Sequence, residues 1–151
     1  MKLAEALIRR KDLNVQILVV KERILSNLVV QEGSEPSEDP NELLEEYNRL
    51  NQQLLEYVQR INRTNQETQF DDSRSIADVI SEKDALMDQH RMLKIIASHA
   101  SSLADRYSVS EIRNISTIDV KTIQKEADEL SRQYRELDIA LQARNWQVDL
   151  L

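Results

Sequence analysis

The chain has 151 residues, a net charge of -7 and no cysteine. It holds one glycine and two prolines, where average usage gives about ten and seven, and this argues against a fold with many strands and tight turns. The missing cysteines exclude disulfides and thiolate metal sites. The acidic balance argues against non-specific nucleic-acid binding, which needs clustered Lys and Arg facing the phosphates.

The length of the chain fits a single domain over residues 1–151. Its longest apolar run, Ile17 to Val20, is far shorter than the roughly 20 residues that a membrane-spanning helix needs. Near the start of the chain, Arg9, Arg10 and Lys11 interrupt any signal-peptide core. We therefore expect a cytoplasmic protein that does not insert stably into membranes.

The spacing of apolar residues predicts a first helix over about residues 2–30. Two apolar rows repeat every seven residues, with Arg10 and Asn27 as polar breaks. The rows contain Leu3, Ala6, Leu13, Ile17, Val20 and Ile24. Further apolar residues widen the stripe: Leu7, Val15, Leu18, Leu25 and Leu28. A stripe this wide is typical of a helix that faces more than one neighbour.

The second helix is predicted from Pro40 to about residue 66, with Asp39 as its N-cap. In the loop before it, Gly33 is placed to end the first helix. The apolar row is Leu43, Tyr47, Leu50, Leu54, Tyr57, Ile61 and Thr64. Its strict 3.5-residue period predicts coiled-coil packing. We expect this helix at the centre of the bundle, with Tyr47 and Tyr57 mostly buried and their hydroxyls hydrogen-bonded.

Two more helices follow in the chain. Ser75 and Asp78 have the spacing of a capping pair at the start of the third, whose apolar row runs from Ile76 to Ala104. Ser116 or Thr117 is expected to cap the fourth helix, which continues at heptad spacing to about residue 144.

The sequence therefore predicts a mainly all-α fold, a bundle of four long coiled-coil-like helices. Residues 106–117 and the C-terminal tail, residues 145–151, alternate polar with apolar side chains and are read as a strand or an extended loop. An alternative adds a small β element in which these two segments pair. The segment 31–50 is acidic and follows a weakly basic helix. Its charges are either matched within the protein or between subunits, or they meet a basic partner.

No enzyme site is predicted from the residue pattern. His90 and His99 fall on opposite sides of a helix, and no His-Glu-x-x-His spacing occurs. A single glycine excludes a glycine-rich phosphate loop. No catalytic residue, metal or cofactor is therefore expected.

Two polar clusters are candidate sites for a small anion or a partner. The residues are Arg60, Asn62, Arg63 and Asn65 in the first, and Arg106, Tyr107 and Glu111 in the second. The other interpretation is that these side chains cap helix ends and make hydrogen bonds between subunits.

Several short runs together resemble the septicolysin-like family of small bacterial proteins. They are residues 30–36, 38–40, 61–65, 105–108, 110–112, 116–117, 119–120, 134–138 and 145–146. In order, they cover essentially the whole chain. The resemblance implies a helical, oligomeric bacterial protein of uncertain function, and the family name implies a pore-forming cytolysin.

The surplus of apolar stripe points to a self-associating helical bundle with a structural or interaction role and no enzyme activity. We expect the chain to bind copies of itself and form a homo-oligomer. We expect no nucleic-acid partner. The alternatives are a pore-forming, cytolysin-like toxin, as the family name suggests, and a small-molecule-binding protein. The sequence does not specify the biological role or the number of subunits.

Overall fold

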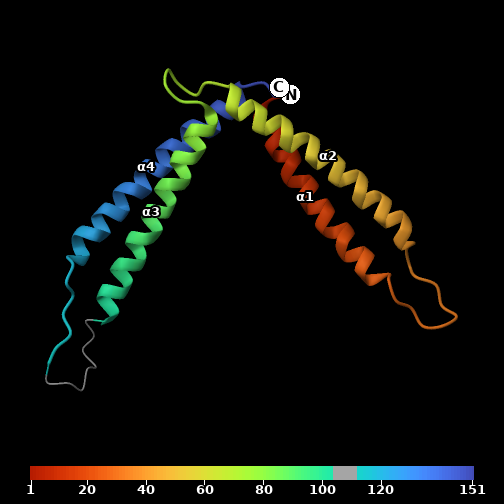
Figure 1. Ribbon diagram of the computed structural model, residues 1–151, viewed down its shortest axis with the longest axis horizontal. Coiled ribbons are helices and arrows are strands. Elements are labelled where there is room, and N and C mark those ends of the chain that lie inside the picture. The colour runs from red at the N-terminus through yellow and green to blue at the C-terminus, as the bar shows by residue number, and fades with distance from the viewer. Residues whose placement is uncertain (104–111) are drawn as a thin grey trace. The chain divides into compact units, whose positions relative to one another are not determined.

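The computed structural model describes residues 1–103 and 112–151, and it confirms the all-α class. The four helices are α1 (Leu3–Ser26), α2 (Pro40–Glu67), α3 (Ile76–Leu103) and α4 (Val120–Gln147). In the part of the chain that the structure describes, there is no β-strand. The helices follow one another in antiparallel pairs, α1 with α2 and α3 with α4 (Figure 1).

The chain divides into two compact units. One consists of residues 1–69 and 144–151 and contains the α1–α2 hairpin, and the other consists of residues 70–143 and contains the α3–α4 hairpin. The expected single domain over residues 1–151 stays a prediction.

Buried Leu13, Ile17 and Val20 of α1 pack against Leu50 of α2 and form the core of the first hairpin. Partly buried apolar residues surround this cluster: Ile24, Tyr47, Leu54 and Tyr57. The heptad row of α2 thus faces α1. Tyr47 and Tyr57 pack against this cluster with most of their surface buried, as predicted, but the predicted hydroxyl hydrogen bonds are wrong, because neither hydroxyl bonds to a described residue. A seam between two helices leaves its edge side chains in contact with solvent.

The first helix ends earlier than the heptad pattern suggested. It stops at Ser26, and Asn27 forms the C-cap, with its N–H donating to the carbonyl of Ile24. The Asn27 amide also donates to the Arg23 carbonyl and accepts from the Glu38 N–H. These bonds fix the turn out of α1. Gly33 has a φ of +85° and lies in the following loop rather than at the helix end.

Short polar side chains begin the other helices. Asp39 accepts from the Asn41 N–H, as predicted. At α3, Ser75 and Asp78 form the expected reciprocal pair, with the Asp78 N–H donating to Ser75 Oγ at 3.1 Å. At α4, the N-cap is Asp119, which accepts from the Lys121 N–H and the Thr122 hydroxyl, and not Ser116 or Thr117.

The predicted β element is not formed by the described residues. Residues 112–117 contain no strand, and residues 106–111 lie outside the described part of the chain. The fourth helix continues to Gln147, and the tail after it pairs with the start of the chain. We call residues 1–3 and 148–151 the tail clasp. Within it, the Leu3 N–H donates to the Val148 carbonyl at 2.9 Å, and the Leu150 N–H donates to the Met1 carbonyl at 2.9 Å.

Candidate functional site

One side of α1 carries a row of exposed aliphatic side chains that do not pack in the hairpin core. Ile8, Val15, Leu18 and Leu25 are 51%, 56%, 56% and 69% exposed. Lys11 and Glu22, both exposed, fall between them at the same spacing. We call these six residues the outer row. Because their spacing alternates between three and four, they form one stripe along the helix, and that stripe faces away from Leu13, Ile17 and Val20.

A shallow hollow of about 500 Å³ lies on the outer row. It is lined only by α1 residues: Leu7, Arg10, Lys11, Asn14, Val15 and Leu18. Four of them, at positions 11, 14, 15 and 18, have the spacing of the residues that receive one side chain of a facing helix in knobs-into-holes packing. The hollow can therefore receive a side chain of a facing helix.

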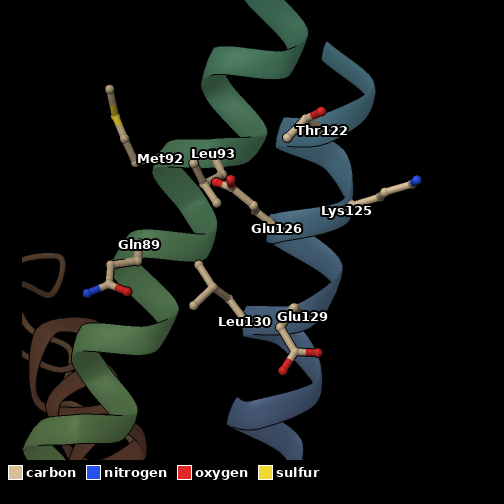
Figure 2. Close-up of a pocket in the computed structure, with 8 residues that line it drawn as sticks. All are labelled: Gln89, Met92, Leu93, Thr122, Lys125, Glu126, Glu129 and Leu130. Carbon is tan, nitrogen blue, oxygen red and sulfur yellow. The ribbon is translucent and has the colours of Figure 1, made fainter. Parts of the chain in front are cut away.

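A second concave surface lies between α3 and α4 (Figure 2). It is an open groove of about 640 Å³. Its lining residues are Gln89, Met92, Leu93, Thr122, Lys125, Glu126, Glu129 and Leu130. Leu93 and Leu130 point into the space between the helices, whereas Lys125 points away from it. The Glu126 side chain also points into this space, so both apolar and polar side chains line the groove.

One of the charged side chains that line the groove, Glu129, is matched by partners on α4. Arg132 donates to Glu129 and to Glu136, and Gln133 also donates to Glu129. Chiefly through the Arg132 hydrogen bond, the pKa of Glu129 falls to about 2. A carboxylate with so low a pKa is a poor general base or acid near neutral pH. Arg132 and Gln133 therefore hold Glu129 as a carboxylate at the edge of the groove.

The first predicted polar cluster lies at the C-terminal end of α2. Arg60 is exposed, and its Nε donates to the Leu151 carbonyl at 2.8 Å. Asn62 and Arg63 are exposed, and Asn65 is half-buried. The helix separates the two arginines from the two asparagines. The second cluster, Arg106, Tyr107 and Glu111, lies outside the described residues. A ligand role for either cluster stays a prediction.

Thr64, within the first cluster, carries the contacts that sequence reasoning missed. It is fully buried, its hydroxyl donates to the Arg60 carbonyl, and it accepts from the Leu151 N–H at 3.0 Å. Near the end of α4, Arg144 Nη2 donates to the Gln69 carbonyl at 2.9 Å. Because the contacts with Leu151 and Gln69 join residues that are far apart in the sequence, no local sequence pattern predicts them.

Two ion pairs hold the hairpins and were not foreseen. In the first hairpin, Arg23 binds Glu38 and lies 3.9 Å from Glu46. Part of the acidic segment 31–50 is therefore matched inside the protein. In the second hairpin, Lys83 Nζ lies 2.8 Å from Asp138 Oδ1 and 5.7 Å from the centre of the Tyr134 ring. This hydrogen bond lowers the pKa of Asp138.

The described residues contain no cluster of three or more His, Asp or Glu side chains that could hold a metal ion. Within residues 1–103 and 112–151, no helix combines the length and apolar character needed to cross a membrane.

The fold and its surfaces define an all-α protein of helical hairpins with exposed apolar faces. The chain belongs to a family of unknown function, DUF6847, whose model matches residues 10–150. It is also similar to a solved structure from Corynebacterium diphtheriae, a conserved protein described as functionally unknown. The two chains are 38% identical with a TM-score of 0.94, and the match covers 100% of this chain and 99% of that one. No curated protein matches the sequence.

The resemblance to a septicolysin-like family is wrong, since both matches lead to a family without an assigned function. Most of the runs that suggested it are loop and helix-end segments, such as residues 30–36 and 116–117. Capping and turn residues recur at such places in unrelated helical proteins for local physical reasons. The cytolysin alternative rested on the family name and loses its basis with it. The chain is thus a helical-bundle protein of unknown function.

Proposed function

We propose that the protein has a structural or interaction role, exerted by self-association through the outer row of α1, and that it is not an enzyme. The observation that carries the proposal is the exposure of Ile8, Val15, Leu18 and Leu25, each of which is more than half exposed. Single exposed apolar residues are ordinary, but a row of four apolar side chains along one side of a helix normally faces a neighbour.

The contrast with the charged side of α4 supports the proposal. There, Arg132 links Glu129 and Glu136 along the exposed surface, which is the usual pattern of a helix face in water. Self-association would remove the outer row of α1 from water, and burial of apolar area is the main driving force of such contacts. A cytoplasmic location is part of the proposal, because a cysteine-free chain needs no oxidising compartment to fold.

Size-exclusion chromatography with light scattering tests this proposal at micromolar protein. We expect a mass that is a multiple of 17.6 kDa. Leu18→Asp should shift the mass to that of one chain, because a charge would be buried in the contact. Ile139→Asp is the matched control: Ile139 is 70% exposed on α4 and lies outside the outer row. Its mass should not change.

Circular dichroism of both variants checks that the helices are intact. A wild-type mass of 17.6 kDa across the micromolar range would contradict self-association. A larger mass that both variants retain would place the contact elsewhere on the molecule.

A further inference from the structure

The order of residue types along the outer row is symmetric about its centre. Read from residue 8 to residue 25, the row is apolar, Lys11, Val15, Leu18, Glu22, apolar. The spacings are three, four, three, four and three, so the row reads with the same spacing from either end. Only the sign of the charge differs between the two halves.

We infer that the occupant of this surface is a second copy of the same chain, with its α1 running antiparallel; this rests on the self-association proposed above. In an antiparallel coiled coil, each a position of the heptad packs against a d position of the other helix. A two-fold axis between Val15 and Leu18 then places Val15 opposite Leu18 of the second copy. It also places Ile8 opposite Leu25 and Lys11 opposite Glu22.

Charge selects this arrangement over the parallel one. The antiparallel pair contains the Lys11–Glu22 contact twice, once on each side of the axis. A parallel pair in register would place Lys11 against Lys11 and Glu22 against Glu22. Like charges that face one another across a helix interface oppose association, whereas opposite charges set its orientation. The charges of Lys11 and Glu22 thus favour the antiparallel orientation of the two helices.

The shape of α1 agrees with a helical occupant. The hollow on the outer row includes positions 11, 14, 15 and 18, and in the antiparallel register it lies opposite Val15 and Leu18 of the second copy. An aliphatic side chain of that copy would enter it as a knob. Neither Lys11 nor Glu22 has a resolved ion pair within the described part of the chain, so both are available to the second copy.

Charge reversal tests the register in the full chain. Lys11→Glu alone and Glu22→Lys alone should each raise the dissociation constant of the dimer by roughly tenfold, since two attractive contacts become repulsive. The double variant Lys11→Glu/Glu22→Lys should return to within about threefold of wild type, because opposite charges face each other again. Arg9→Glu is the control, since Arg9 is exposed on α1 but lies outside the row. Sedimentation equilibrium measures the dissociation constants of the wild type and the four variants.

Cysteine cross-linking tests the orientation directly, because the natural chain has no cysteine. The double variant Ile8→Cys/Leu25→Cys should form a covalent dimer under mild oxidation, since the paired positions face each other. Leu25→Cys alone should not, because its two copies would lie about 26 Å apart along the helix axis.

The outcomes separate the two proposals. A covalent dimer from Leu25→Cys alone, or a double charge reversal that stays as weak as the single ones, overturns the antiparallel register while self-association stands. A wild-type chain that is monomeric at every concentration overturns both.

Discussion

The two hairpins differ in where their apolar side chains lie. In the α1–α2 hairpin, a compact seam around Leu13 and Leu50 is accompanied by surplus apolar side chains on the outer side of α1. In the α3–α4 hairpin, apolar side chains line the groove between the helices, and the outer side of α4 carries an Arg132-centred ion pair network. Helices of similar length therefore present different surfaces. The exposed row of α1 is therefore a particular feature of the first hairpin, not a general property of long helices.

The largest expected effect comes from breaking the seam of the first hairpin. Leu13 is fully buried, so Leu13→Ala should lower the free energy of unfolding by about 2–5 kcal/mol. Leu18→Ala removes the same atoms from a side chain that is 56% exposed and should have a much smaller effect at protein concentrations low enough to give monomer. Urea unfolding followed by circular dichroism measures both. Equal losses would show that the seam and the outer row are not distinct surfaces.

An intermediate effect is expected at the ion pair of the second hairpin. Lys83→Ala removes the cation that pairs with Asp138, at a site where the two side chains are 18% and 35% exposed, and leaves Asp138 with only the longer hydrogen bond from Gln142. We expect a loss of about 1 kcal/mol, because a partly buried charge that loses its hydrogen bond is destabilising. Arg91→Ala is the control, since its pair with Asp88 is 67% and 75% exposed and should contribute little. If the two variants unfold at the same urea concentration, Lys83 does not hold the seam.

The smallest effect is the response to acid. The pKa of Glu129 falls from an ordinary 4.5 to about 2 in the folded protein, so its stabilisation is present above about pH 4.5 and is lost as the pH falls towards 2. Glu129→Gln should therefore unfold with a shallower dependence on pH in this window. Thermal melts between pH 6 and pH 2 measure the slope. Above pH 5, we expect the slopes of the variant and the wild type to agree.

The pattern of apolar residues was sufficient to predict four helices and several of their caps, because both depend on neighbours within one or two turns. Asp39 and Ser75 are examples. The end of α1 was not predictable in this way, since the bonds of Asn27 depend on Glu38 in the next loop. The apolar alternation of the tail was real, but its partner lies at the other end of the sequence. A period of two identifies an extended segment and says nothing about what it pairs with.

In the sequence, the outer row of α1 appeared only as additional apolar residues beside the two heptad rows of the first helix. Val15, Leu18 and Leu25 were recognised as apolar positions beyond the seam, yet a helix that is apolar around much of its circumference does not show which side meets its own hairpin partner. The structure assigns the Leu13 side to α2 and leaves the other exposed. The tail contacts at the first polar cluster were not predictable for a different reason: Arg60 and Thr64 bind the tail, which no spacing along α2 indicates.

The tail clasp has a topological consequence. It joins Lys2 to Asp149, so the first compact unit is built from two stretches of sequence separated by all of residues 70–143. The connections within the hairpins are much shorter than the loop that the clasp closes, so closing them costs less chain entropy. A single cut of the backbone between α3 and α4 would convert this loop into two polypeptides. The clasp contacts and the packing of α3 on α4 would then have to hold two separate fragments together.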